Sequence, residues 1–352
     1  VGKCSMFTAF LINDPSDDPG AYLEFKYRRE VFLFDLGDLQ RLPPRQIRKI
    51  THIFVSHTHM DHFIGFDHLL RICLGRNQHI SLFGPPGFLA NVESKLGAYT
   101  WNLVKNYTND FELAVTEIHN THKITRYYRC RNAFIPEGEE MCAVSSTKLL
   151  EEDSFLVNYA FLDHGIPCLA FSIEEKNRLN IKKNVLSAMG LPTGAWITRL
   201  KEQIMNNESA ETPVHVWWKT EKGTVEEKFV PLGTLRERAV KITAGQKVCY
   251  ITDAVWSNEN VEKIVKLAGG AELLFIEAPF LQEDAANAAG KYHLTAHQAG
   301  TLASMAGVKR LIIFHFSPKY KGRHEALQRE AMNAFHSRTF FDDEQNRQDD
   351  AG

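Results

Sequence analysis

The segment His57-Thr58-His59-Met60-Asp61-His62 constrains this chain more than any other, because it places three imidazoles and one carboxylate within six residues. If the segment leaves a strand, side-chain alternation points His57 and His59 to the same side, while Asp61 and His62 lie on the turn that follows. Donors in this pattern suit two neighbouring metal ions, and imidazole with carboxylate favours zinc, with manganese or iron as alternatives. A polar loop rich in histidine is the other interpretation, and the number of donors at this spacing favours the metal site.

The segments on either side of this motif are typical of a strand followed by a helix. Residues 53–55 form a short apolar run of strand type. After the motif, apolar side chains recur at helical spacing until Gly75, and the residues concerned are Phe63, Phe66, Leu69, Leu70, Cys73 and Leu74. The motif therefore lies on a strand-to-helix turn. We expect His52 to be a strand residue and His68 to be a surface or packing residue of the helix.

The pattern His-x-His-x-Asp-His at residues 57–62 resembles the signature of the metallo-β-lactamase superfamily. The resemblance implies an α/β chain folded as an αββα sandwich, in which two β-sheets face each other and helices cover the outside. It also implies that metals bind at one edge, where strands end. We therefore expect an αββα metallo-β-lactamase sandwich with a dinuclear metal site at the sheet edge.

Three further strand ends carry a histidine or an aspartate. A strand predicted over residues 155–161 leads to His164 at a hairpin tip, and two later predicted strands end just before Asp253 and His315. Alone, a turn aspartate or a strand-end histidine is common. Their joint position after buried strands favours metal ligands.

Together with the motif, these residues complete a pair of metal sites. We expect one metal to be held by His57, His59 and His164, the other by Asp61, His62 and His315, and both to be bridged by Asp253. Each ion then keeps a position for a shared water or hydroxide. Two metals about 3.5 to 4 Å apart lower the pKa of that water and neutralise charge on a phosphoryl or acyl oxygen. We expect two Zn²⁺ ions, with Mn²⁺ or Fe²⁺ as alternatives, and hydrolytic chemistry.

The second half of the chain resembles the ribonuclease Z family, the endonucleases that remove 3′ trailers from tRNA precursors. The segments that carry the resemblance are 163–167 (DHGIP), 272–280 (ELLFIEAPF), 292–299 (YHLTAHQA) and 311–320 (LIIFHFSPKY). The similarity extends with gaps from about residue 30 to residue 325. Ile276, Pro279 and Leu294 depart from the family's motifs, and none of them is a predicted metal ligand.

His293 is a candidate for chemistry rather than for metal binding. Thr295 is placed to cap a helix that ends at Gly307, and a histidine just before such a cap points toward the site. The family resemblance implies that His293 stabilises a phosphoryl oxygen or protonates the leaving group. Glu277, at the neighbouring predicted strand end, is placed to orient it. We group Asp61, His293 and Glu277 as catalytic candidates. The alternative for His293 is an ordinary residue beside a helix cap.

Length and composition fit one large domain. With 352 residues, 44% of them hydrophobic, the chain can bury a substantial core, so we expect a single metallo-β-lactamase-fold domain over 1–341 and a disordered tail over 342–352. Lys plus Arg (41) nearly balance Asp plus Glu (43), so nucleic-acid binding requires a local basic patch. Six cysteines without a C-x-x-C pair, and the lack of a long apolar segment, predict a cytoplasmic protein that has no membrane partner.

Residues 174–247 form the candidate substrate-binding arm or insert. Ribonuclease Z enzymes carry an arm that grips the tRNA body, and residues 190–196 (GLPTGAW) resemble its Gly-Pro element. The first part of this segment is basic, and such charges can neutralise phosphates. The substrate-binding candidates are Lys182, Lys183 and Trp196. A solvated polar face gives the same composition.

Two further segments remain ambiguous from the sequence. Arg126, Arg129 and Arg131, interleaved with Tyr127 and Tyr128, predict either an RNA contact or an exposed hairpin. A second pair of segments, Trp217-Trp218 and 225–230, is predicted as strands of the insert or of the second sheet.

Three functional classes fit these observations. The favoured one is a ribonuclease Z-like phosphodiesterase that cleaves the 3′ trailer of tRNA precursors through a metal-bridging hydroxide, with RNA as its partner and a homodimer as the assembly that the resemblance implies. The second is a small-molecule metallo-hydrolase acting on a cyclic phosphodiester, a sulfate ester or a lactone. The third is a non-catalytic scaffold, against which the full set of ligand candidates argues.

Overall fold

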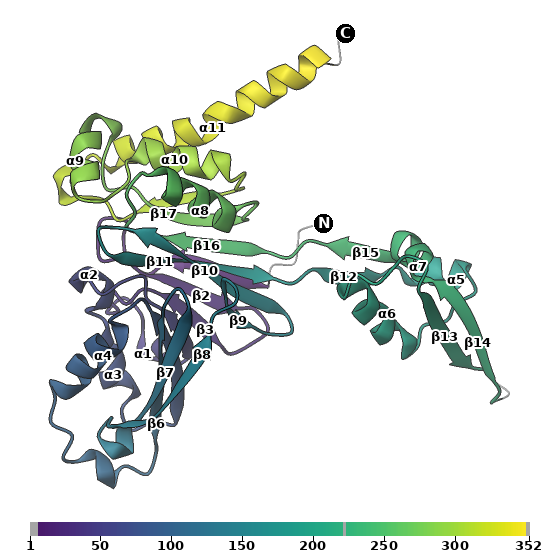
Figure 1. Cartoon of the computed structure of the whole chain (residues 1–352), viewed down its shortest axis with the longest axis horizontal. Coiled ribbons are helices and arrows are strands. Elements are labelled where there is room, and N and C mark those ends of the chain that lie inside the picture. Colours follow the sequence, from purple (N-terminus) through teal and green to yellow (C-terminus); the bar gives the residue numbers. More distant parts are fainter. Residues whose placement is uncertain (1–5, 221–222, 350–352) are drawn as a thin grey trace. The chain divides into compact units, whose positions relative to one another are not determined.

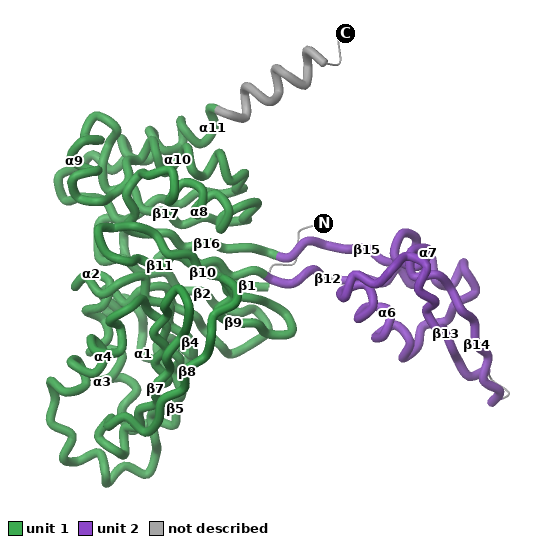
Figure 2. Tube along the Cα trace, in the orientation of Figure 1, with its two compact units in different colours: residues 1–174, 246–352 green, residues 175–245 purple. Residues whose placement is uncertain are grey.

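The computed structural model describes residues 6–220 and 223–349, with side chains described up to Ser337 apart from that of Arg178. The chain divides into two compact units, one of residues 1–174 and 246–352 and the other of residues 175–245 (Figure 2). The second unit has nearly the bounds of the predicted insert. Helix α11 is described as far as Asp349, so it includes part of the tail over 342–352 that the sequence predicts to be disordered. Residues 350–352 lie outside the described residues, and the disorder of the tail stays a prediction.

The first sheet of the larger unit has eight strands arranged in chain order. These strands are β1 (Phe7–Leu11), β2 (Ala21–Phe25), β3 (Val31–Phe34), β4 (Ile50–Phe54), β5 (Gln78–Gly84), β6 (Phe111–Ile118), β7 (His122–Arg129) and β8 (Pro136–Ala143). The strands from β3 to β6 pair in parallel, so each connection between them crosses over the sheet. The crossovers contain α1 (Pro44–Ile47), α2 (Met60–Phe63) with α3 (Phe66–Cys73), and α4 (Phe88–Gly97).

The second sheet has six strands in the order β18-β17-β16-β11-β10-β9. These strands are β9 (Lys148–Glu151), β10 (Phe155–Asp163), β11 (Pro167–Glu175), β16 (Lys247–Ile251), β17 (Leu273–Glu277) and β18 (Leu311–Phe314). β16, β17 and β18 are parallel to one another, and helices connect them. The helices of this half are α8 (Asn258–Ala268), α9 (Ala285–Gly290), α10 (Ala296–Met305) and α11 (His324–Asp349).

Three apolar clusters hold these layers together. One lies between the sheets, where Phe32 contacts Phe155, Phe54 contacts Phe171 and other rings interleave in the same way, with ring centroids 5.6 and 5.4 Å apart for these two pairs. The second cluster joins the first sheet to α3 and α4, and the third joins the second sheet to α8 and α10. The layers follow the order helix, sheet, sheet, helix (Figure 1), which confirms the predicted αββα sandwich.

The helical face predicted from Phe63 to Leu74 is divided between α2 and α3. Gly65 separates the two helices, and its N–H donates to the carbonyl oxygen of Leu36 at 2.8 Å. A Cβ at Gly65 would clash with the carbonyl oxygen of Gly37, so only glycine lets the loop after β3 pass this close. This close approach brings the end of β3 beside the histidine motif.

The smaller unit has its own apolar core. It contains β12 (Arg178–Ile181), α5 (Lys183–Ala188), α6 (Trp196–Met205), β13 (Pro213–Lys219), β14 (Val225–Pro231), α7 (Leu232–Ala239) and β15 (Val240–Thr243). β12 pairs with β15 and β13 with β14, both antiparallel. The strands predicted at Trp217-Trp218 and over 225–230 therefore belong to the insert and not to the second large sheet.

Across the described residues, no helix combines the length and the apolar character that crossing a membrane requires.

Candidate metal centre

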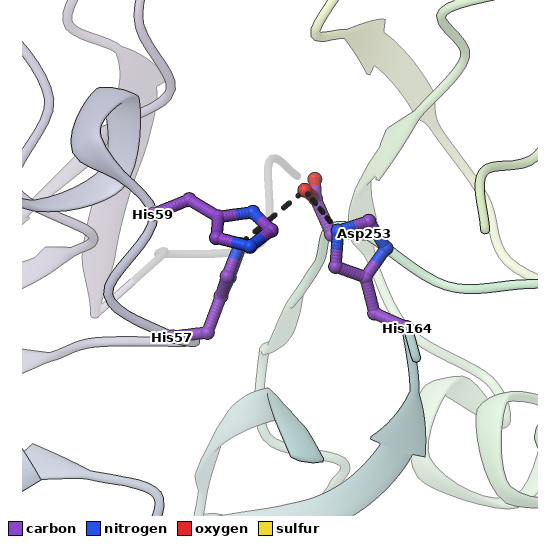
Figure 3. A group of neighbouring side chains, drawn as sticks. All are labelled: His57, His59, His164 and Asp253. Carbon is purple, nitrogen blue, oxygen red and sulfur yellow. Dashed lines mark ion pairs between the residues drawn. The ribbon is translucent and has the colours of Figure 1, made fainter. Parts of the chain in front are cut away.

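The predicted ligands come together where strands of both large sheets end. His57 follows β4, His164 lies between β10 and β11, Asp253 follows β16, and His315 follows β18. Donor atoms of His57, His59, His164 and Asp253 all lie within 4.8 Å of one another, and Figure 3 shows their side chains converging. The Nε2 atoms of His57 and His164 lie 3.5 and 3.3 Å from Oδ2 of Asp253.

A second group of donors lies on the other side of Asp253. Asp61, His62 and His315 each have a donor atom within 4.8 Å of those of the other two. Nε2 of His315 lies 3.2 Å from Oδ2 of Asp61, and Nε2 of His62 lies 3.4 Å from the same oxygen. The carboxylate of Asp253 faces both groups, with Oδ1 at 3.0 Å from Nδ1 of His315 and Oδ2 at 3.5 Å from Nε2 of His62. These are the two groups expected from the sequence, while the assignment of each ligand stays a prediction.

Hydrogen bonds at the far ring nitrogen orient three of the histidines. Nδ1 of His62 donates to Asp35 at 2.9 Å, and Nδ1 of His164 donates to the carbonyl oxygen of Tyr292 at 2.8 Å. Oγ of Ser56 lies 3.0 Å from both Asp35 and Nδ1 of His57, so it can donate to the carboxylate and accept from the ring. Each ring therefore presents Nε2 to the centre, which is the usual arrangement around ligating histidines.

Two of these Nε2 atoms are buried without a hydrogen-bond partner among the described residues, those of His57 and His62. A buried polar atom without a partner costs about 1–3 kcal/mol, and a bound cation would satisfy both. Burial, with the neighbouring His62, lowers the pKa of His57 to about 2, so its imidazole is neutral as a metal ligand must be. Burial raises the pKa of Asp253, but attraction to His315 and His62 outweighs it and holds this pKa well below the usual range. The same attraction holds the pKa of His62 and His315 well above 6.5, so a bound cation would take the place of their second ring proton. The residues present thus fit a divalent metal.

The backbone is strained at three of the strand ends that meet here. Asp35, Asp253 and His315 have positive φ angles of 59°, 46° and 63°. Residues other than glycine rarely adopt this left-handed conformation, which costs on the order of 1–3 kcal/mol. The turn directs each side chain toward the centre immediately after its strand.

Asp35 belongs to this site and was not predicted from the sequence. It is fully buried, and its Oδ1 accepts from the N–H of Ser56 at 2.6 Å. Its Oδ2 accepts from the hydroxyl of Tyr250 at 2.8 Å and from His62. The sequence does contain the pattern that identifies Asp35, because this residue follows the apolar strand β3 much as Asp253 follows β16.

His293 lies beside the metal centre and is held by Glu277. Nδ1 of His293 lies 2.8 Å from Oε2 of the fully buried Glu277. The other oxygen of Glu277 accepts from the N–H groups of Ala254 and Leu294, so the carboxylate cannot turn away. Burial lowers the pKa of His293, but attraction to Glu277 outweighs it and raises this pKa above 6.5. This arrangement agrees with the orienting role expected for Glu277, while the catalytic role of His293 stays a prediction.

The helix after His293 begins and ends as predicted. Thr295 caps α10 by accepting from the N–H of Gln298 at 3.1 Å, and the side chain of Gln298 accepts from the N–H of Thr295 at 2.9 Å. Gly307 has a φ of 60° after the end of the helix. His297 lies exposed on this helix, as expected.

The substrate-binding candidates differ in their surroundings. Lys182 and Lys183 are exposed at the start of α5. Trp196 is only 2% exposed, packs in the core of the smaller unit and donates from Nε1 to the carbonyl oxygen of Pro192 at 3.0 Å. The prediction of a substrate contact for the Trp196 ring therefore requires correction, because its side chain supports the fold of this unit.

Two arginines of the predicted basic group, Arg126 and Arg129, lie on β7 and pair with carboxylates, whereas Arg131 is exposed beyond the end of this strand. Arg126 pairs with Glu93 at 2.9 Å and with Glu139 at 2.7 Å. Arg129 pairs with Glu112 at 3.3 Å and with a second carboxylate on β8. These ion pairs favour the hairpin interpretation over an RNA contact.

Two facing sheets with helices on both outer sides, and histidines and aspartates gathered where the strands end, define a metal-dependent hydrolase of the metallo-β-lactamase fold. Residues 14–134 match the family model described as Beta-lactamase superfamily domain. The chain is 31% identical to the ribonuclease Z of Methanothermobacter thermautotrophicus, over 87% of this chain and 83% of that one. It is 27% identical to the ribonuclease Z of Deinococcus radiodurans, over 94% and 95%. The chain belongs to the ribonuclease Z family.

Solved structures agree with the fold. The short form of human tRNase Z superposes with a TM-score of 0.51 at 19% identity, over 90% of this chain and 94% of that chain. The metallo-beta-lactamase fold protein YhfI from Bacillus subtilis gives a TM-score of 0.53 at 14% identity, over 94% and 93%. The predicted superfamily, fold class and ribonuclease Z resemblance are thus confirmed.

Proposed function

We propose that this protein is an endonuclease that removes the 3′ trailer from tRNA precursors and that it uses two zinc ions. The relatives named ribonuclease Z support the reaction. The observation that carries the proposal is the pair His293 and Glu277, joined at 2.8 Å beside the predicted metal ligands. Glu277 also accepts from two backbone N–H groups and lies 3.4 Å from Nδ1 of His315, and its contact with the partly exposed His293 supplies the positioned proton donor that a phosphodiesterase needs.

The donor set favours zinc among divalent metals. The ligands expected for one ion are His57, His59 and His164, those for the other are Asp61, His62 and His315, and Asp253 is shared. Imidazole-rich sets with few carboxylates suit zinc better than magnesium or calcium. When bound, such ions activate water and neutralise charge on a phosphoryl oxygen.

The protein's own residues position the proton that the reaction requires. Glu277 accepts from Nδ1 of His293, so Nε2 is the nitrogen left to face the substrate. His293 retains 16% exposure of its side chain, while Glu277 is fully buried, so substrate reaches the first and not the second. Protonated His293 can donate to a phosphoryl oxygen or to the departing ribose oxygen.

Residues 175–245 are proposed to bind the body of the RNA. They form a compact unit with its own core, which Trp196 helps to hold. Lys182 and Lys183 are exposed on this unit and can neutralise phosphates. The homodimer implied by the family resemblance stays a prediction.

A comparison of two substrates tests the proposed function. We would measure kcat/KM for a tRNA precursor with a 3′ extension and for bis-p-nitrophenyl phosphate, with zinc or manganese present. The proposal predicts that the precursor is strongly preferred. Hydrolysis of the small phosphodiester without cleavage of the precursor would favour a small-molecule hydrolase instead.

A further inference from the structure

A cavity in the larger unit lies apart from the predicted metal ligands, and the charged side chains that line it are all positive. It has a volume of about 620 Å³ and lies between β10, β11, α8 and the loop at residues 144–147. Its charged lining residues are Lys247, Lys263 and Lys266, and none of the aspartates and glutamates that the structure describes lines it. Such a lining attracts an anion.

One lysine and one hydroxyl in this cavity have no partner within the described part of the chain. Lys247 donates to the carbonyl oxygen of Gly269 at 3.2 Å, and Lys263 pairs with Glu259 at 2.6 Å. Lys266 makes no ion pair with any residue that the structure describes. Ser172 is 1% exposed, and its Oγ has no hydrogen-bond partner among the described residues. A buried hydroxyl is normally satisfied, so the hydroxyl of Ser172 is available to a hydrogen-bonding group that enters this cavity, a ligand oxygen or water.

A second cavity extends from this one toward the hairpin that carries His164. It has a volume of about 370 Å³, shares Asn120, Phe161 and Lys263 with the first, and reaches Gly165 beside the ligand candidate His164. Among the described residues, Asp163 is its only acidic lining residue, and it already accepts from the N–H of Gly165 at 2.8 Å. The two cavities follow β10 from Asn158 to Asp163, a path of roughly 17 Å at about 3.4 Å per residue.

We propose that these two cavities form one groove that binds the single-stranded 3′ trailer downstream of the bond that is cut. The inference rests on the proposed function and adds to it the path of the trailer. Proteins bind single strands with positive charges for the phosphates and aromatic rings for the bases. Phe161 is half-buried where the cavities meet, and Tyr159 packs edge-on against it at 5.8 Å. A small anion would fill the lysine-lined part but would not account for the continuation to the hairpin that carries His164.

Trailer length provides the test. We would compare precursors with a short and a long trailer on the wild-type enzyme, on Lys266→Ala and Ser172→Ala, and on the control Lys105→Ala, an exposed lysine that lines neither cavity. The groove predicts that wild type prefers the long trailer and that Lys266→Ala reduces this preference roughly 10-fold, the size of a charge-assisted contact. The salt dependence of long-trailer binding should fall by about 0.7 in logarithmic slope. Cleavage of the short-trailer precursor and of bis-p-nitrophenyl phosphate should not change.

A binding measurement separates this inference from the proposed function. Fluorescence anisotropy of a labelled single-stranded RNA in the presence of EDTA requires no catalysis. Weaker binding by Lys266→Ala than by Lys105→Ala supports the groove, even if neither precursor is cleaved. Equal binding by the two variants, or a wild-type enzyme that ignores trailer length, would overturn the groove and leave the proposed function intact.

Discussion

Glu277 holds His293 at 2.8 Å with one carboxylate oxygen and anchors itself with the other, which accepts two backbone N–H groups. The fully buried carboxylate fixes the ring and raises its pKa, and the ring remains partly exposed beside the predicted metal ligands. This geometry supports the proposed role of His293 as a proton donor beside the metal centre.

Replacing His293 should slow the chemical step of the reaction and leave metal binding unchanged. We expect His293→Ala to lower kcat about 10²- to 10⁴-fold at unaltered KM. The defect should shrink for a substrate with a good leaving group if the ring protonates the departing oxygen. Glu277→Gln should cause a smaller loss and move the pH profile to lower pH. His297→Ala, on the exposed side of α10, is the control, and full activity of His293→Ala on both substrates would contradict the role.

Loss of Asp253 should affect both metals, because its carboxylate faces both donor groups. Asp253→Ala is expected to lower total metal content and abolish hydrolysis, whereas His315→Ala should mainly weaken one site. Elemental analysis of the purified variants measures this. Unchanged stoichiometry in Asp253→Ala would remove the shared-ligand assignment.

Asp35 should influence metal binding without touching a metal. Its carboxylate fixes Nδ1 of His62 at 2.9 Å, and loss of such a partner typically weakens metal affinity about 10- to 100-fold. We expect Asp35→Asn to show this loss in a competition titration with a zinc chelator. Tyr250→Phe removes another hydrogen bond to the same carboxylate and should have a smaller effect. Wild-type affinity in Asp35→Asn would show that the ring does not need this bond.

His52 should contribute to acid unfolding. Burial, with the neighbouring His79, lowers its pKa to about 4 from 6.5, so the folded protein favours the neutral ring. The associated stability is present above pH 6.5 and is lost as the pH falls toward 4. His52→Gln should flatten the dependence of Tm on pH in this interval. A curve as steep as that of wild type would assign the acid sensitivity to other groups.

The exposed lysines of the smaller unit should affect large substrates only. Neutralising Lys182 and Lys183 is expected to raise KM for a tRNA precursor and flatten its salt dependence, and to spare bis-p-nitrophenyl phosphate. Lys241→Ala, exposed on β15 of the same unit, is a matched control. Equal losses on both substrates would indicate that the lysines support folding instead.

The sequence predicted which residues the fold brings together at the candidate metal centre, because each of them follows an apolar strand that the core buries. Their role as metal ligands stays a prediction. Asp35 shows the same pattern and could have been predicted from it. Trp196 was misjudged because it ends the segment 190–196 that resembles the Gly-Pro element of the arm, although Leu200 and Ile204 continue its helical spacing and are buried with it. The proposed trailer groove could not be predicted, since Asn120, Phe161 and Lys266 meet only through the fold.

The position of the cut tests the central claim most directly. A tRNA precursor with a defined 3′ trailer would be incubated with the metal-loaded enzyme, and the 3′ end of the tRNA product would be mapped at single-nucleotide resolution. The proposal predicts one endonucleolytic cut at the junction of the tRNA and its trailer, with the trailer released in one piece. Stepwise shortening of the trailer, or no cleavage while bis-p-nitrophenyl phosphate is hydrolysed, would contradict it.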